Sequence, residues 1–156
     1  INPLGKVPVL ELDDGSYIPE SLSIIEYFEE LYPEPSLTGN TPEERAKIKA
    51  IERFIDFEIM GTMGIMAHHM MPLFANRFIQ SQAVIDYGRA RQLEGLNYLE
   101  KFIGKSDFVC GNEVSIADIT LFVTLDSAPM LKAFPDSRYG NILRCYENFK
   151  ARPSVF

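Results

Sequence analysis

The chain has 156 residues, of which 46% are hydrophobic and 24% charged, so it can form one large domain, or a small domain beside part of another, with a proper hydrophobic core. Acidic residues outnumber basic ones by 22 to 15, which gives a formal net charge of −7, and lysine and arginine form no cluster. This acidic balance argues against binding to nucleic acid and against binding to an anionic membrane surface.

Two isolated cysteines, Cys110 and Cys145, have no C-x-x-C partner. This usage is typical of a reducing compartment rather than of a secreted disulfide scaffold, so we expect a cytoplasmic protein. The longest stretch without a formal charge covers residues 59–76, but it contains two glycines, two histidines and Pro72. We therefore expect a long amphipathic helix that ends near Pro72, and no transmembrane segment.

In the N-terminal part, two short apolar runs flank the sequence Asp-Asp-Gly-Ser at residues 13–16. Asp-Gly between such runs is a strong signal for a β-hairpin, because glycine accepts the positive φ of a tight turn. We expect strands over 7–12 and 17–18, and then a helix that opens at 19–21. Apolar positions three and four residues apart continue along this helix at Ile24, Ile25, Phe28 and Leu31.

Glu20 and Ser21 are expected at the N-terminus of that helix, where unpaired backbone N–H groups carry a partial positive charge. Such an end attracts a carboxylate, and the Ser21 hydroxyl adds a donor. The Glu20 carboxylate would oppose a bare anion but can accept a hydrogen bond from an ammonium group, so the pair suits a zwitterion. Taken singly, Ser21 could be only a helix cap, and Glu20 only an acid that stabilises the helix dipole.

Residues 32–40 are rich in turn formers, which indicates a linker. Thr41, Pro42 and Glu44 then give the start signal of a helix: a cap, a proline in the first turn and an acid three residues after the cap. The apolar stripe of this helix consists of Ile48, Ile51, Ile55 and Ile59.

Residues 77–104 predict a second long helix. Two helices of this length, joined near Pro72, form an antiparallel hairpin. On one face of the second helix we expect Leu93, Leu96, Leu99 and Ile103, with Phe102 beside them.

Ser115 and Asp118 are expected to form a capping box before another helix. Ser115 can cap the N–H of Asp118, the Asp118 carboxylate can return to the N–H of Ser115, and Val114 and Ile119 can close over the pair. The residues through Leu125 are apolar nearly all round, so this helix should be buried. One more amphipathic helix carries Tyr139, Ile142, Leu143, Tyr146 and Phe149.

The order of strand, hairpin, strand and helix, with Val7-Pro8 at the first strand and Glu20-Ser21 at the helix, resembles the second half of the thioredoxin-like domain of the cytosolic glutathione S-transferases. The Ser115-x-x-Asp118 element resembles the capping box in their all-helical domain, and the resemblance covers essentially the whole chain. It implies an α+β, mostly α fold, in which a β-hairpin plus helix from the C-terminal half of a thioredoxin-like domain precedes an all-α helical bundle. The implied boundaries are 1–35 for the partial thioredoxin-like domain, 36–41 for the linker and 42–156 for the helical domain.

This resemblance implies a glutathione S-transferase, a detoxification enzyme that joins the thiolate of its co-substrate glutathione to an apolar electrophile. Glu20 and Ser21 would hold the zwitterionic γ-glutamyl head. The backbone of Val7, which precedes a cis-proline in the family, would pair with the cysteinyl part, and Lys6 would reach a carboxylate. Pro8 could also be an ordinary proline at a strand entrance.

The middle of the first long helix supplies an apolar wall for the electrophile in the family. Phe57, Met60, Gly61 and Gly64 are expected to face the cleft here, and the two glycines would leave room for the ligand. Five methionines between positions 60 and 71 have mostly helical spacing, for which core packing is the simpler interpretation. For the capping box we expect a structural role without ligand contact.

The residue that acts on the glutathione sulfur is a Tyr, Ser or Cys in an N-terminal β-α-β segment of the family, and here it is expected upstream of Ile1. A donor near the sulfur lowers the thiol pKa and so favours the thiolate nucleophile. The family's C-terminal end is likewise expected beyond residue 156. No metal site is expected, because the adjacent His68 and His69 diverge by about 100° on a helix.

Family members are usually homodimers, so we expect a homodimer; the charged residues along 43–56 would form a polar rim or simply a solvated face. The alternative is a non-catalytic module of the same fold, used for interaction or assembly. The Glu20-Ser21 pair favours the enzyme, because an interaction module has no need to recognise a γ-glutamyl zwitterion. The lack of the sulfur-activating segment favours the module.

Overall fold

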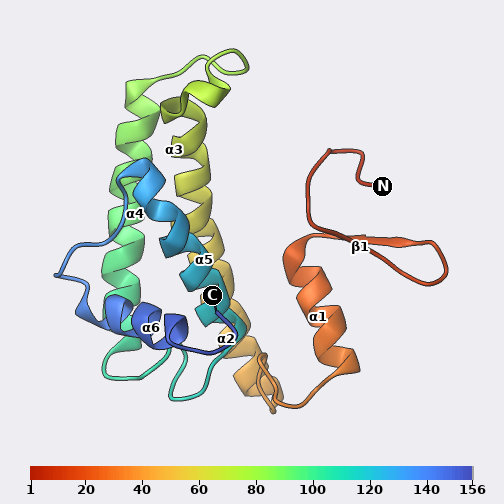
Figure 1. The fold of residues 1–156 in the computed structure, drawn as a ribbon. Coiled ribbons are helices and arrows are strands. Elements are labelled where there is room, and N and C mark those ends of the chain that lie inside the picture. The colour runs from red at the N-terminus through yellow and green to blue at the C-terminus, as the bar shows by residue number, and fades with distance from the viewer. Residues whose placement is uncertain (156) are drawn as a thin grey trace.

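The computed structural model describes residues 1–155, which form a small N-terminal unit of one sheet and one helix and a larger bundle of helices (Figure 1). The predicted α+β, mostly α fold is confirmed. In chain order the elements are β1 (Val9–Glu11), β2 (Tyr17–Pro19), α1 (Ser21–Leu31), α2 (Pro42–Phe54), η1 (Ile55–Gly61), α3 (Thr62–Met70), η2 (Pro72–Phe74), α4 (Gln82–Ile103), α5 (Ile116–Ser127), η3 (Ala128–Leu131) and α6 (Gly140–Lys150).

The predicted hairpin is present, although β1 is shorter than the expected 7–12 and β2 extends one residue beyond the expected 17–18. β1 and β2 are antiparallel, and Leu10 lies opposite Ile18. The N–H of Leu12 donates to the C=O of Ser16 at 2.9 Å, and Gly15 takes a φ of +81° in the turn. Local turn chemistry therefore fixes the register of the two strands.

Helix α1 begins at Ser21 as predicted, but none of its residues is buried. Phe28 and Leu31 are 41% and 51% exposed, and the Phe28 ring stacks on Tyr32 with centroids 6.5 Å apart. The apolar spacing thus forms a helix face that residues 1–155 do not cover.

Glu29 ties α1 to the linker and, through it, to the helical bundle. Its carboxylate accepts from the N–H of Leu37 at 3.0 Å and from the N–H and hydroxyl of Thr38 at 3.1 and 3.0 Å. The C=O of Leu37 accepts in turn from the N–H of Ile116, the first residue of α5, at 2.9 Å. The small unit is therefore fastened to the bundle by hydrogen bonds rather than by apolar packing alone.

The long helix predicted to end near Pro72 is confirmed, because α2, η1 and α3 follow one another without a break in helical φ and ψ. Its N-terminus has the predicted capping box between Thr41 and Glu44. Residues 55–61 form a π-helical segment that the sequence did not predict. The Thr62 hydroxyl lies 2.8 Å from the carbonyl oxygens of Glu58 and Ile59, so it supplies a donor where the regular ladder is interrupted.

Helix α4 runs back along η1 and α3, which completes the predicted helical hairpin (Figure 1). A Cβ atom on Gly88 would lie 2.5 Å from Cγ of Met66, and one on Gly95 would lie 3.0 Å from Cγ1 of Ile59. The two glycines, seven residues apart on α4, therefore let the helices approach closely.

Two predictions for α4 are wrong. The helix begins at Gln82 rather than near residue 77, because Pro72 opens a 3-10 turn and a loop follows it. Leu93 is 44% exposed, as is Phe102, whereas Gln92 is buried and donates from Nε2 to the C=O of Ala133 at 3.1 Å. Leu93 lies about 100° around the helix from Gln92 and so leaves the core.

The core lies between the long helix, α4, α5 and α6. Helix α5 is buried along most of its length as predicted, with Leu121 and Leu125 1% and 0% exposed, but Val123 departs from the prediction at 47% exposed. Met63 and Met66 are buried, in agreement with core packing, whereas Met60 is 37% exposed. Residues that are fully enclosed in this core include Ile55, Ile59, Leu99 and Ile142.

The capping box at the start of α5 is confirmed. The Asp118 carboxylate accepts from the N–H of Ser115 at 2.9 Å, from its hydroxyl at 3.0 Å and from the N–H of Val109 at 2.8 Å. Asp118 is buried, and this burial raises its pKa, although the three donors act in the opposite direction. The carboxylate thus joins α5 to the preceding loop.

Among residues 1–155, no helix combines the length and the apolar character that crossing a membrane requires.

Candidate functional site

The strand register brings the two N-terminal motifs together. Val9 lies opposite Pro19, and this is the last pair of the ladder. Val7-Pro8 directly precedes Val9 and Glu20-Ser21 directly follows Pro19, so the two motifs lie at the same end of the hairpin, where α1 begins. The Val7-Pro8 peptide is cis.

Asn2 shapes the segment that leads to this point. Its Oδ1 accepts from the N–H of Leu4 at 2.9 Å, its Nδ2 donates to the C=O of Lys6 at 3.0 Å, and its C=O accepts from the N–H of Gly5 at 3.0 Å. These bonds close a turn over residues 2–6, directly before Val7. A role for Asn2 was not predicted, although the Asn-Pro pair that opens this turn is a typical turn signal.

The N-terminus of α1 is open. Glu20 takes the cap position, with a φ of 70°, and its side chain makes no capping hydrogen bond. Ser21 is the first helical residue, so the interpretation of Ser21 as only a cap is wrong. The N–H of Ile24 donates to the C=O of Glu20 at 3.1 Å, which leaves the preceding three N–H groups without a helical partner.

The residues around the N-terminus of α1 are exposed to solvent, and two of them are charged. Lys6, Glu20 and Ser21 are exposed, and Val7 is 90% exposed. Within residues 1–155, the structure shows no hydrogen bond to the N–H or C=O of Val7. The end of the hairpin where α1 begins thus carries an exposed cation, an exposed anion, an open helix N-terminus and a backbone segment without hydrogen bonds.

The residues predicted to form the electrophile wall lie together on the exposed side of η1 and α3. Phe57 is 65% exposed and Met60 37% exposed, and Gly61 and Gly64 are exposed beside them. The Arg53 guanidinium lies 4.3 Å from the Phe57 ring centroid. The wall is apolar along most of its length, with one cation at its N-terminal end.

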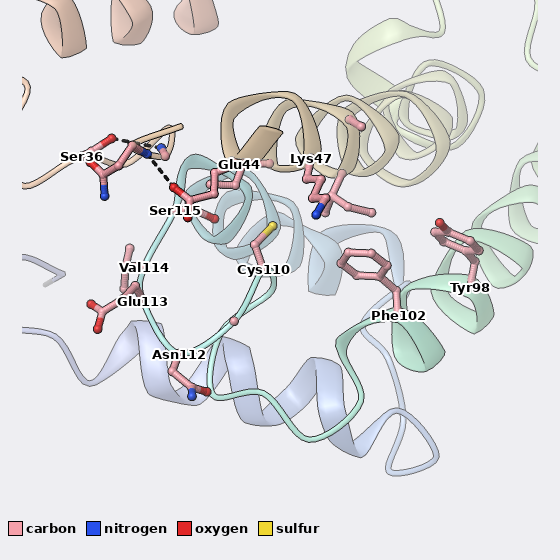
Figure 2. A pocket seen from close by; sticks show the side chains of 16 residues that line it. Ser36, Glu44, Lys47, Tyr98, Phe102, Cys110, Asn112, Glu113, Val114 and Ser115 are labelled. Carbon is pink, nitrogen blue, oxygen red and sulfur yellow. Dashed lines mark hydrogen bonds between the residues drawn. The ribbon is translucent and has the colours of Figure 1, made fainter. Parts of the chain in front are cut away.

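A hollow of about 630 Å³ lies elsewhere, between α2, the last turns of α4 and the loop at 108–115 (Figure 2). Ile51, Phe102 and Cys110 are among its lining residues, and none of the predicted wall residues is. The sequence did not point to this hollow, because its lining comes from segments far apart in the chain.

The two cysteines and two histidines lie apart from the residues predicted to bind glutathione and the electrophile. Burial raises the pKa of Cys110 to about 11 and that of Cys145 to about 12, so both remain thiols at neutral pH. His69 accepts from the N–H of Ser81 at its Nδ1, at 3.2 Å. The His68 ring stacks on the ring of Phe78, with centroids 4.8 Å apart. In the part of the chain that the structure describes, no group of three His, Cys, Asp or Glu side chains could bind a metal.

A hairpin-and-helix unit of thioredoxin type, followed by an all-helical bundle, defines the two-part architecture of the glutathione transferases. Comparison with known families agrees: residues 1–36 match the N-terminal domain of glutathione S-transferase, and residues 62–153 match its C-terminal domain. The chain belongs to the glutathione S-transferase family, whose co-substrate is glutathione.

Individual relatives give the same result. The chain is 31% identical to glutathione S-transferase 2 of Saccharomyces cerevisiae, over 99% of the chain and 67% of that protein. It is 27% identical to maleylacetoacetate isomerase of Pseudomonas aeruginosa, over 87% of the chain and 68% of that protein. The crystal structure of Gtt2 from Saccharomyces cerevisiae matches with a TM-score of 0.87 at 31% identity, over 99% of this chain and 75% of that one. The chain therefore spans about two thirds to three quarters of these relatives.

Proposed function

We propose that the protein is a glutathione transferase that conjugates glutathione to an apolar electrophile, and that Lys6, Val7, Pro8, Glu20 and Ser21 bind the glutathione. The strand register is the observation that supports this proposal, because Val9, which follows Val7-Pro8, pairs with Pro19, which precedes the open N-terminus of α1. The activity in the printed name of the yeast relative supports it.

Each group in this place has a counterpart in glutathione. The γ-glutamyl carboxylate binds the free N–H groups of α1 and the Ser21 hydroxyl, where the helix dipole favours an anion. The neighbouring ammonium group donates to the Glu20 carboxylate. The cysteinyl part pairs with the N–H and C=O of Val7 as an added extended segment, and Lys6 binds the second carboxylate.

The reaction joins the glutathione sulfur to an electrophilic carbon, while a leaving group departs or a proton is taken up. We assign to residues 1–155 the binding of the two substrates, and to Cys110 and Cys145 no part in the reaction, because burial raises the pKa of both thiols far above neutral. Phe57, Met60 and the two glycines beside them form the wall for the electrophile. Asp118 stabilises the fold and contacts no ligand.

We further propose a cytoplasmic homodimer. Both cysteines are free thiols, as expected in a reducing compartment. The uncovered apolar face of α1, with Phe28 and Leu31 exposed, would be buried against another protein surface in such an assembly. Sedimentation at micromolar concentration would show the association.

Substitution of Glu20 tests the binding site. Glu20→Ala should weaken glutathione binding by about 1.5–3 kcal/mol, the usual contribution of a hydrogen bond to a charged group, which is roughly 10- to 150-fold in Kd. Isothermal titration of the full-length protein measures it. Glu30→Ala is the matched control, because Glu30 is an exposed acid at the other end of α1.

Equal glutathione affinity in Glu20→Ala and the wild type would contradict the assigned site. Absence of glutathione binding in the wild type itself would instead favour the non-catalytic interaction module.

A second candidate reaction, glutathione-dependent cis–trans isomerisation, is supported by the Pseudomonas relative and by a maleylacetoacetate isomerase of Mus musculus that is 31% identical. An isomerase for such a substrate has to hold two carboxylates, whereas the exposed Phe57, Met60 and Ile65 form an apolar surface. We therefore place conjugation first. Parallel rates with a chloronitrobenzene and with maleylacetoacetate separate the two reactions.

A further inference from the structure

The long helix made of α2, η1 and α3 keeps one line of side chains buried along several successive turns. Four side chains at a spacing of four residues form this line: Ile51, Ile55, Ile59 and Met63, with exposed fractions of 6%, 0%, 0% and 3%. In a regular α-helix four residues rotate by about 400°, so this spacing would drift by about 40° at each step and by about 120° over the whole line. The line stays on the core because residues 55–61 are π-helical and use more residues for each turn.

The π-helical turn has the same effect on the opposite side of the helix. Phe57 lies two residues after Ile55, and two residues rotate a helix by roughly half a turn. Ile65 likewise lies two residues after Met63. Both side chains therefore point away from the core, and they are 65% and 52% exposed. In a regular α-helix Ile65 would stand about 80° around the axis from Phe57.

A line of exposed positions thus follows the wall proposed for the electrophile. It runs from Phe57 through Gly61 to Ile65, again at a spacing of four residues. These eight positions rise by about 12 Å along the helix axis, at about 1.5 Å per residue. Gly61 has no side chain, so the line leaves a gap between two bulky apolar groups.

Thr62 closes the π-helical turn. It is the first residue of α3 and is 8% exposed. Its N–H donates to the C=O of Ile59, three residues back, whereas a regular α-helix would use the C=O of Glu58. The Thr62 hydroxyl lies 2.8 Å from the carbonyl oxygen of Glu58 and 2.8 Å from that of Ile59. The side chain therefore supplies a donor where the change of helical register displaces the backbone N–H.

Helix α4 holds the same turn from the other side. Arg91 forms an ion pair with Glu58, and a Cβ atom on Gly95 would lie 3.5 Å from the carbonyl oxygen of Glu58. The Thr62 hydroxyl is the part of this arrangement that can be removed with little change of shape, because valine has the same branched side chain.

We propose that Thr62 is a positioning residue for the electrophile. Its hydroxyl holds the π-helical turn that aligns Phe57, Gly61 and Ile65, and Ile65 forms the C-terminal end of the wall. The aligned wall suits electrophiles with an extended apolar chain that lies along the helix. This inference rests on the proposed transferase function and defines the substrate class of the same site.

Two S-alkyl derivatives of glutathione test this role in the full-length protein. S-methylglutathione and S-hexylglutathione share the peptide and differ in the chain that can reach the wall, so the wild type should bind the hexyl compound more tightly. Thr62→Val should reduce the ratio of hexyl to methyl affinity about fourfold, the contribution of roughly one buried methylene group, and leave the methyl affinity unchanged. Thr62→Ser keeps the hydroxyl and should restore the ratio. Ile65→Ala should lower the ratio in the same way as Thr62→Val.

Thr124→Val is the matched control. Thr124 is also buried, and its hydroxyl donates to the C=O of Thr120 at 2.6 Å, but it lies in α5, outside the wall. This substitution should lower stability and leave the hexyl-to-methyl ratio unchanged. An unchanged ratio in Thr62→Val, or an equal fall of the ratio in Thr124→Val, would overturn the inference.

Amide hydrogen exchange, followed by mass spectrometry, examines the turn without any ligand. In Thr62→Val a peptide that covers residues 55–63 should exchange about fivefold faster, as expected for the loss of one hydrogen bond, and in Thr62→Ser it should match the wild type. Failure of the wild type to bind either compound would contradict the proposed function. Unchanged exchange in Thr62→Val would overturn the inference by itself, whatever the ligand affinities are.

Discussion

Removal of the Asp118 carboxylate tests the structural role of the capping box. In the wild type this carboxylate accepts from the N–H groups of Val109 and Ser115 and from the Ser115 hydroxyl, and all of these groups are buried or nearly so. Asp118→Ala leaves the two N–H groups without an acceptor in a place that water does not reach. The loop before α5 then loses its connection to the helix.

The expected cost follows from those two donors. A buried N–H left without a partner costs about 1–3 kcal/mol, so two of them cost roughly 2–6 kcal/mol. Removal of a buried charge offsets part of this cost, since burial raises the pKa of Asp118. We expect a net loss of about 2–4 kcal/mol, which for a chain of this size lowers Tm by roughly 5–15 °C.

Thermal unfolding followed by circular dichroism measures the change, and isothermal titration measures glutathione affinity in the same samples. Glu113→Ala is the control, because Glu113 is an exposed acid in the same loop. Asp118→Asn should also lower Tm, but by less than Asp118→Ala, because its amide oxygen can still accept from one side while its NH₂ meets a donor on the other. An unchanged Tm together with a large loss of glutathione affinity would refute the structural interpretation of this residue.

Three other substitutions have expected outcomes. Glu52 is buried, and its Oε2 lies 3.7 Å from Nη1 of Arg53 but has no hydrogen-bond partner within residues 1–155. Burial raises its pKa; a raised folded pKa adds stability at low pH and withdraws it as the pH rises, so Glu52→Gln should raise Tm at pH 7.5 and lose that advantage near pH 4. Gly88→Ala should cost about 1–3 kcal/mol in urea unfolding, because its Cβ would lie 2.5 Å from Cγ of the enclosed Met66; an unchanged midpoint would show that α4 can move away. His69→Ala removes the acceptor for the N–H of Ser81 and should cost about 1 kcal/mol, which His69→Asn should restore if the hydrogen bond is the cause.

Features set by neighbouring residues were the ones that the sequence predicted well. The Asp-Gly turn and the two capping boxes each depend on groups within five residues of one another, so the residue types alone determine the hydrogen bonds. The π-helical segment was different. Ile55 and Ile59 have the spacing of an ordinary helix, and only the position of the Thr62 hydroxyl and the close approach of Gly95 distinguish this turn from its neighbours.

Errors about burial have one physical cause. Leu93 and Val123 are apolar and lie at helical spacing from core residues, but each stands on the side of its helix that no other helix covers. Gln92 shows the converse, because the C=O of Ala133, 41 positions further along the chain, satisfies its amide inside the core. The spacing of apolar residues predicts that a helix has an apolar face, but the width of the buried part of that face depends on which helices pack against it.

The residues that we propose to bind glutathione lie close together in the sequence, on either side of one hairpin in which Val9 pairs with Pro19, ten positions further along the chain. The hollow at Phe102 and Lys47 has no such short path, since its lining comes from the linker, two helices and a loop. The sequence contains no pattern that predicts contacts between segments so far apart in the chain.

The backbone at Glu20 adds an argument of a different kind. A φ of 70° on a residue with a side chain costs about 1–3 kcal/mol, and glycine would avoid this cost. The Glu20 side chain neither caps α1 nor is buried, so the fold gains nothing visible from the carboxylate in return. We infer that this strained, exposed carboxylate is kept for ligand binding, in agreement with the glutathione site proposed at the open N–H groups of α1.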